Sequence, residues 1–207
     1  MPAYETDHDQ IESLKKVWGD YGKWIVIAVI IGLAIGFGWR YWQGQKNVQR
    51  QQASLLYQQL IMADQQNKSD SVTQMTEEMT KRYPQSGYTA LANLVAAKNA
   101  VQQNKSDQAL QNLLWVTDHA TNAGIKQIAR LRTAQVYIDQ KQYPQASQAL
   151  AKVDDATFQP LIDQLQGDIY SGQGDRMKAR QYYQSAQAAL SSEVGEDKVL
   201  AMELAQP

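Results

Sequence analysis

The chain has 207 residues, with 20 Lys and Arg against 21 Asp and Glu, two His and no Cys. The lack of Cys excludes a disulfide framework, a thiol nucleophile and any thiolate metal site. A net charge of -1 gives no field that attracts nucleic acid, because such binding needs clustered Lys and Arg. The mean hydropathy of -0.52 describes a polar chain, but this average conceals an apolar segment near the start.

The first predicted element is a short amphipathic helix within residues 1–20. Ile11, Leu14, Val17 and Trp18 fall on one face of a helix, with polar residues between them. Such a helix is suited to lying along a membrane surface or to binding a partner.

An apolar run of sixteen residues without a charge follows, from Trp24 to Trp39. As a helix it rises roughly 24 Å, short of a hydrocarbon core of ~30 Å, so flanking aromatic and basic side chains are expected to complete the span. A core helix would not need these flanks, and the bulky end of the run does not fit the cleavage site of a signal peptide. Residues 21–42 are therefore predicted to be a single transmembrane helix and signal-anchor. The anchoring residues are Trp24, Gly32, Gly36, Trp39, Arg40 and Trp42.

Two features of this span leave alternatives open. Gly32 and Gly36 share a stripe with Ala28, which favours close packing against another helix, although Gly is also common in lipid-facing helices. Three basic residues lie on each flank, so charge alone does not decide the topology.

The rest of the chain contains a degenerate repeat. A shift of 33 residues aligns two copies, and successive shifts of 37 align two weaker copies upstream. The matched sets, in chain order, are Leu60, Ala63, Val72, Thr76 and Met79; Ala97, Ala100, Ala109, Leu113 and Val116; Ala134, Tyr137, Ala146, Leu150 and Val153; Gly167, Tyr170, Ala179, Tyr183 and Ala186. The spacing resembles the tetratricopeptide repeat, a helical hairpin in which small residues lie where the two helices approach closely.

The predicted fold class is all-α: a single N-terminal transmembrane helix followed by a tetratricopeptide-like solenoid of helical hairpins. Three to four hairpins are expected in residues 53–190, after a helical linker at 43–52 and before a tail at 191–207 that is compatible with a short capping helix. The predicted helices are 44–65, 70–83, 87–103, 106–118, 123–140, 144–153, 159–171 and 175–190.

No pattern of residues predicts catalysis, a metal site or a cofactor. The Gly residues lack the Lys and Ser or Thr of a phosphate-binding loop, and His119 is predicted to be a helix-end residue. The carboxylate pair of Asp154 and Asp155 diverges on a helix, because adjacent side chains point about 100 degrees apart. We therefore expect a protein that is not an enzyme.

Stacked hairpins instead predict a groove lined by the first helix of each hairpin. Its mixed aliphatic and polar lining favours apolar or extended protein segments as ligands, and the Lys-and-Asn clamp for a terminal carboxylate is missing. Leu94 and Leu131 are equally compatible with the hairpin core. The predicted groove positions are Leu94, Lys98, Val101 and Gln102; Leu131, Gln135, Ile138 and Asp139; Gln164 and Asp168.

The N-terminal region, together with the repeats, resembles the YfgM family, the ancillary subunit of the SecYEG translocon. The specific residues are Tyr4-Glu5, Asp9-Gln10-Ile11-Glu12, Leu14-Lys15-Lys16, Gly22-Lys23 and Gly38-Trp39-Arg40-Tyr41-Trp42. The resemblance implies a single-pass protein of the bacterial inner membrane, with its N-terminus in the cytoplasm and its repeats in the periplasm. It also implies association with SecYEG and with the periplasmic chaperone PpiD, and contact with translocating or unfolded envelope proteins.

The function expected from these observations is that of a non-catalytic, membrane-anchored adaptor that helps pass translocated proteins to periplasmic chaperones. The alternative is a periplasmic scaffold for envelope assembly or cell division, which septal localisation of a fluorescent fusion would favour. Neither function involves nucleic acid.

Overall fold

The computed structural model describes residues 48–189 and, before them, Trp24, Val26, Ile27, residues 30–33, Gly36 and Arg40. The chain divides into two compact units, Met1–Gln51 and Gln52–Pro207. Every described residue of the first unit is helical and exposed. Across the described residues of both units, no helix combines the length and the apolar character that a membrane crossing requires. Most of the predicted transmembrane segment, 21–42, lies outside these residues, as do 1–20 and 191–207.

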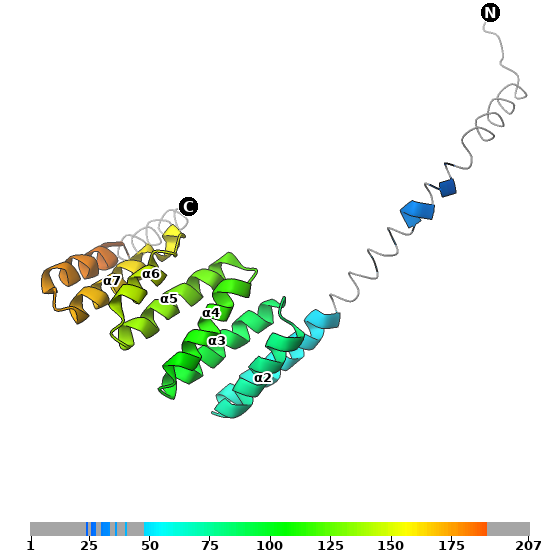
Figure 1. The fold of residues 1–207 in the computed structure, drawn as a ribbon, viewed down its shortest axis with the longest axis horizontal. Coiled ribbons are helices and arrows are strands. Elements are labelled where there is room, and N and C mark those ends of the chain that lie inside the picture. Colours follow the sequence, from blue (N-terminus) through cyan, green and yellow to red (C-terminus); the bar gives the residue numbers. More distant parts are fainter. Residues whose placement is uncertain are drawn as a thin grey trace, which may run out of the picture. The chain divides into compact units, whose positions relative to one another are not determined.

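The second unit is built from helices, and residues 52–189 contain no strand. Its helices follow one another in chain order in Figure 1. The elements are a first helix over 52–65, then α2 (Ser69–Arg82), α3 (Gly87–Gln102), α4 (Ser106–His119), α5 (Ala123–Asp139), α6 (Tyr143–Leu150), the short 3-10 helix η1 (Ala156–Phe158), α7 (Gln159–Gly172) and a last helix over 176–189. From α2 to α7 the predicted bounds are confirmed to within three residues, the largest difference being the end of α6 at Leu150.

The helices pair into four hairpins through turns of one type. The turn residue has a positive φ in each case, and the amide of the next residue donates to the carbonyl five residues earlier. This hydrogen bond defines the Schellman motif, which ends a helix and reverses the chain. The four pairs are Lys68 with Ala63 (2.9 Å), Lys105 with Ala100 (2.8 Å), Gln142 with Tyr137 (2.8 Å) and Asp175 with Tyr170 (2.9 Å).

The core follows the repeat register. All ten matched positions of the two upstream copies are buried, from Leu60 to Val116. In the third copy Tyr137 and Val153 are half-buried, and in the last copy Tyr170 is half-buried and Tyr183 is 38% exposed. The buried residues therefore confirm the repeat that the shifts of 33 and 37 predict.

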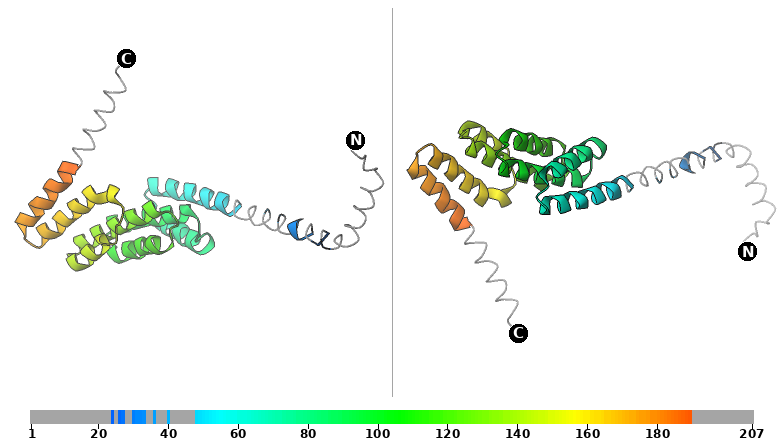
Figure 2. Two further views of the ribbon diagram at one scale, coloured as in Figure 1. Left: turned by 90° about the horizontal axis from the view of Figure 1, so that it is seen from above. Right: turned by 90° about the horizontal axis from the view of Figure 1, so that it is seen from below.

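Three apolar clusters form the core, and the first helix of a hairpin joins one cluster to the next. α3 contributes Ala92 and Ala96 to one cluster and Leu94 and Ala97 to another, because most of its sides are covered. α5 has the same role, packing against both α4 and α6. In both views of Figure 2 the last helix, 176–189, runs beside α7. Contacts between sequence neighbours thus build the unit, as in other helical repeat proteins.

Candidate functional site

A cavity of about 360 Å³ opens between α3 and α5, the first helices of consecutive hairpins. α3 and α5 each present residues spaced three or four apart, which fall on one helical face. Leu113 of α4 reaches the bottom of the cavity. The full lining is Ala97, Lys98, Val101, Gln102, Leu113, Arg132, Gln135, Val136 and Asp139.

This cavity brings together five of the predicted groove residues: Lys98, Val101, Gln102, Gln135 and Asp139. All five are exposed, so their side chains are accessible to a ligand. The repeat register places them there because the first helix of each hairpin faces the same side of the stack.

The floor and rim of the cavity differ in chemistry. Ala97, Leu113 and Val136 are buried and form an apolar floor. The rim carries charges of both signs and two Gln amides, which can each donate and accept hydrogen bonds. An aliphatic side chain on the floor, with its peptide groups against the rim amides, fits this arrangement.

One rim cation is already paired. The Lys98 ammonium lies 3.4 Å from the Asp64 carboxylate of the first helix, and more than half of the Lys98 side chain is exposed. An exposed ion pair of this kind stabilises by no more than about 1 kcal/mol, so a ligand can displace it. Arg132 and Asp139 form no ion pair with any other described residue.

The remaining predicted groove residues lie elsewhere. Leu94 and Leu131 are only 7% and 4% exposed and belong to the apolar core. Ile138 is half-buried against the core cluster of α5, α6 and α7. Gln164 is exposed on α7 but does not line the cavity. The cavity is therefore confined to α3, α5 and the floor residue from α4.

Asp168 has a structural partner. Its carboxylate accepts a hydrogen bond of 2.7 Å from the Tyr183 hydroxyl. Burial and this hydrogen bond to Asp168 raise the pKa of Tyr183 above its usual value. Asp168 thus holds the last helix to α7 and does not line the cavity.

The predicted anchor residues are described only in part. Trp24, Gly32, Gly36 and Arg40 are helical and exposed, whereas Trp39 and Trp42 fall outside the described residues. A Cβ added to Gly32 or Gly36 would meet no heavy atom within 4 Å. Their role as a membrane anchor stays a prediction.

His119 is the last residue of α4, as predicted. Its ring stacks on Trp115 at 4.7 Å between centroids, and its Nδ1 lies 3.0 Å from the Trp115 carbonyl oxygen. Both contacts hold the end of the helix. Within the described part of the chain, no group of three or more His, Asp or Glu is arranged to hold a metal ion.

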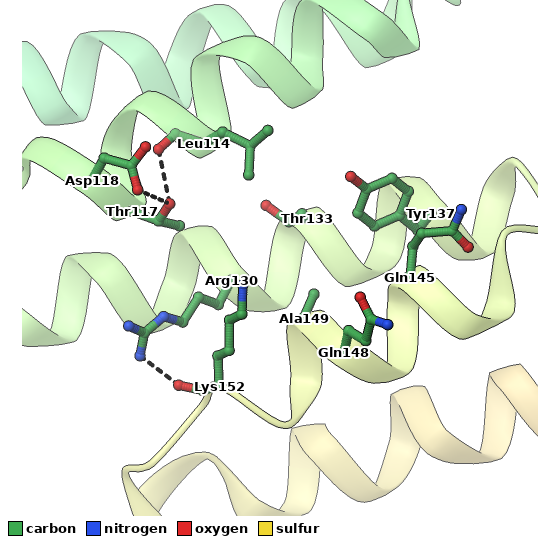
Figure 3. Close-up of a pocket in the computed structure, with 10 residues that line it drawn as sticks. All are labelled: Leu114, Thr117, Asp118, Arg130, Thr133, Tyr137, Gln145, Gln148, Ala149 and Lys152. Carbon is green, nitrogen blue, oxygen red and sulfur yellow. Dashed lines mark hydrogen bonds between the residues drawn. The ribbon is translucent and has the colours of Figure 1, made fainter.

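Sequence reasoning missed a pair of equivalent pockets on another face of the hairpins. One, of about 240 Å³, lies between α4, α5 and α6, and Figure 3 shows Arg130 and Lys152 joined by a hydrogen bond at its edge. The other, of about 400 Å³, lies between α2, α3 and α4. Nine of the ten residues lining the first pocket have a counterpart 37 residues earlier in the second. Three of these pairs are chemically identical: Thr80 with Thr117, Gln108 with Gln145 and Gln111 with Gln148.

The shift of 37 already contained the signal for these pockets. Its apolar and small positions predict the core, whereas the polar positions between them line the two pockets. The three identical polar pairs belong to the same repeat, but a pattern of apolar residues does not include them.

Comparison with protein families matches residues 15–206 to the tetratricopeptide repeat-like domain. The chain belongs to this family. Membership of the tetratricopeptide repeat-like family confirms the repeat fold that the spacing predicted, and it covers nearly the whole chain. No solved structure matches the sequence.

Three curated proteins are similar to this tetratricopeptide repeat-like chain, and each is named ancillary SecYEG translocon subunit. The protein of Escherichia coli K12 is 34% identical over 101 residues, which are 49% of this chain and 48% of that protein. The Haemophilus influenzae protein is 37% identical over 102 residues, or 47% and 48% of the two chains. The Aggregatibacter actinomycetemcomitans protein is 29% identical over 100 residues, 48% of each chain. The match thus spans about half the length of these curated relatives, and it confirms the resemblance to the ancillary translocon subunits.

Proposed function

We propose that this chain is a non-catalytic adaptor of the SecYEG translocon that binds extended protein segments in the cavity between α3 and α5. The observation that carries the proposal is the coincidence of two findings. Three similar proteins are named ancillary SecYEG translocon subunits, and the repeat register brings five exposed residues around one cavity. An apolar floor with amides at its rim suits a segment that passes in an extended conformation.

The finer parts of the proposal concern place and partners. Residues 21–42 anchor the chain in the inner membrane, with the repeat domain in the periplasm. There the cavity receives segments of translocated proteins, or of the chaperone PpiD, and passes clients to periplasmic chaperones. The sixteen-residue apolar run and the resemblance of the first 42 residues support this topology.

The test of binding is site-specific photocrosslinking in Escherichia coli cells that produce the full chain. A benzophenone amino acid at Gln135 should give crosslinks to a SecYEG component, to PpiD or to a protein in transit. The matched control is the same group at Met177, which is 78% exposed on the last helix and does not line the cavity. Equal adduct patterns from both positions, or none from Gln135, would contradict the proposal.

Topology has a separate test, because the chain contains no Cys. A single Met177→Cys variant should react with a membrane-impermeant maleimide once the outer membrane is permeabilised. Labelling that requires lysis of the inner membrane would place the repeats in the cytoplasm and refute the assignment.

A further inference from the structure

The repeat unit has a second polar surface, on the face formed by the second helices of its hairpins. The two equivalent pockets lie there, one between α2 and α4 over α3, the other between α4 and α6 over α5. The cavity proposed to bind protein segments lies between α3 and α5, and it shares no lining residue with either pocket. The pockets are therefore a surface separate from that cavity.

The groups that the two pockets have in common are uncharged. In each pocket one helix contributes two Gln side chains three residues apart, which fall on one helical face, and another helix contributes a Thr. Figure 3 shows this arrangement in the pocket of α4, α5 and α6, where Gln145 and Gln148 lie on one helix and Thr117 on another. The equivalent residues of the other pocket are Gln108, Gln111 and Thr80.

Internal hydrogen bonds limit what these groups offer to a ligand. The Thr80 hydroxyl donates to the Thr76 carbonyl oxygen, and the Thr117 hydroxyl donates to the Leu114 carbonyl oxygen, both at 2.8 Å. Each hydroxyl is therefore left as an acceptor. The four Gln side chains form no hydrogen bond with any other described residue, so each amide keeps both a donor and an acceptor.

Charged side chains line both pockets, but their signs are not repeated. Glu77 and Lys81 in one pocket correspond to Leu114 and Asp118 in the other. Nucleic acid or an anionic lipid surface needs cations at repeated positions. A polyanion therefore does not fit the chemistry that the two pockets share.

Aromatic rings are not repeated either. Trp115 in one pocket corresponds to Lys152 in the other, and Tyr137 in the second pocket corresponds to Ala100, which lines neither. The Trp115 ring is also stacked on His119. Sugar rings bind with their apolar faces against aromatic side chains. The shared lining therefore does not favour a polysaccharide, whose sugar units would meet an aromatic ring at equivalent positions.

We propose that this face binds an extended polypeptide through its main chain, with one segment occupying both pockets. A main chain is uncharged, and it repeats an N–H donor and a carbonyl acceptor at nearly every residue, whatever its sequence. A Gln amide can donate to such a carbonyl and accept from such an N–H, and a Thr hydroxyl can accept from another. Main-chain hydrogen bonds also give the affinity when a peptide adds to the edge of a sheet.

Recognition of the main chain makes this face tolerant of different side chains, in contrast to the cavity with its apolar floor. Because the two surfaces are separate, the chain can hold one segment here while the cavity is occupied. A segment of about twelve residues extends ~40 Å, which is enough to cross three neighbouring helices of about 10 Å each.

The test uses the full chain in detergent and a fluorescent peptide of about twelve uncharged residues, Ser, Thr, Val and Gln. A benzophenone amino acid replaces Leu114, which lines one pocket and is 44% exposed, and should form an adduct with the peptide. The same peptide with an N-methyl group on every second residue keeps its side chains but loses half of its main-chain donors. It should give at least about tenfold less adduct, because several hydrogen bonds are lost.

Substitution of the amides tests the residues themselves. Gln145→Leu combined with Gln148→Leu should lower the adduct at Leu114 about tenfold, because the main chain loses its partners on α6. The matched control is Gln181→Leu with Gln184→Leu, an exposed pair with the same spacing on the last helix that lines neither pocket. All four side chains are exposed and Leu favours helices, so the circular dichroism of the repeats should not change.

Occupation of both pockets by one segment has its own readout. With the benzophenone group at Glu77 of α2, in the other pocket, the α6 substitutions should still lower the adduct about threefold, because a bridging segment loses half of its contacts. An unchanged adduct at Glu77 would overturn the bridging.

Three results would overturn recognition of the main chain. These are the absence of an adduct at Leu114, equal adducts from the methylated and unmethylated peptides, and displacement of the peptide by chitin oligosaccharides. None of these measurements uses Gln135, so their failure leaves the crosslinks expected from the cavity as a separate result.

Discussion

Gly167 in α7 occupies the position at which the repeat requires a small residue, and its contact with Tyr183 gives the reason. A Cβ added to Gly167 would lie 2.5 Å from Cε1 of the Tyr183 ring. The ring cannot turn away freely, because its hydroxyl is held by Asp168 at 2.7 Å. Tyr143 lies in the same way against Gly172, so an aromatic ring covers a Gly backbone at two places in the last two hairpins.

Replacing Gly167 with Ala should therefore destabilise the chain, even though Ala favours helices. We expect a net loss of about 1–2 kcal/mol of unfolding free energy, because overpacking outweighs a gain in helix propensity of up to about 1 kcal/mol. Urea unfolding followed by circular dichroism measures this change. Gly87→Ala is the control, since a Cβ there meets nothing within 4 Å and should be neutral or slightly stabilising. Equal effects of the two substitutions would show that the Tyr183 contact is not the cause.

Asp175 gives the last hairpin a dependence on pH. Its carboxylate accepts a hydrogen bond of 3.1 Å from the Lys178 amide at the start of the last helix, and this bond lowers the pKa of Asp175 below its ordinary value of 3.8. The folded chain thus favours the ionised carboxylate. The stabilisation is present in full above the unfolded pKa and is lost as the pH falls through the lower folded pKa.

Asp175→Ala should accordingly lower the urea midpoint at about pH 7, and the difference from wild type should shrink as the pH falls below about 3.8. Asp175→Asn retains an oxygen acceptor without the charge, so its urea midpoint at neutral pH should lie between those of wild type and Asp175→Ala. A difference between wild type and Asp175→Ala that stays constant down to about pH 2 would rule out a contribution from ionisation.

At the scale of elements, the four hairpin turns share one geometry despite different sequences. Asn67, Asn104 and Lys141 have φ between 57° and 60°, and Gly174 has φ of 85°. An ordinary L-residue pays about 1–2 kcal/mol for the left-handed conformation, which Asn tolerates and Gly adopts freely. Lys141 is therefore the least favourable residue among the four turns.

Lys141→Gly should stabilise the chain by about 0.5–1 kcal/mol, after allowing for the larger entropy that Gly loses on folding. Gly174→Ala places an ordinary L-residue at a positive φ and should lower the unfolding free energy by about 1 kcal/mol. Both values come from urea unfolding of the full chain. A destabilised Lys141→Gly variant would mean that the Lys side chain contributes more to the turn than its backbone strain costs.

The helices were more predictable than the turns between them. Small and apolar residues at regular spacing determine which faces of neighbouring helices pack together. Residues of this kind, such as Ala109 and Leu113, are buried as expected. The turns carried a signal that the apolar pattern does not contain: the six residues Gln-Gln-Asn-Lys-Ser-Asp occur identically at 65–70 and at 102–107. Asn at the third position of each copy is the residue with positive φ.

The residues that line the cavity could be predicted only as far as the repeat spacing shows which face of each helix they occupy. Lys98 and Gln135 lie on its rim because each faces outwards from the first helix of its hairpin. Leu94 and Leu131 share that helical face but lie deeper, because neighbouring helices cover them. The spacing of residues along one helix does not show how far the next hairpin covers them. The boundary between groove and core therefore depends on how the whole unit packs.

At the scale of the whole molecule, the core formed by residues 52–189 is a chain of three clusters and not a single centre. α3 links the first cluster to the second, and α5 links the second to the third. In such a stack, stability is approximately the sum of the hairpins and of the contacts between neighbours. A defect in one hairpin is therefore expected to act mainly on that hairpin and the next.

Leu150 in α6 and Leu60 in the first helix are both fully buried and belong to different clusters. Truncating either to Ala should cost about 2–5 kcal/mol locally. Measured by hydrogen exchange of the full chain, Leu150→Ala should speed the exchange of amides in 143–172 by at least about thirtyfold and change those in 52–82 by less than about threefold. Leu60→Ala should show the reverse distribution. If either variant speeds exchange equally from 52 to 189, the repeats unfold as one cooperative unit, and the contacts between neighbouring hairpins are stronger than the hairpins themselves.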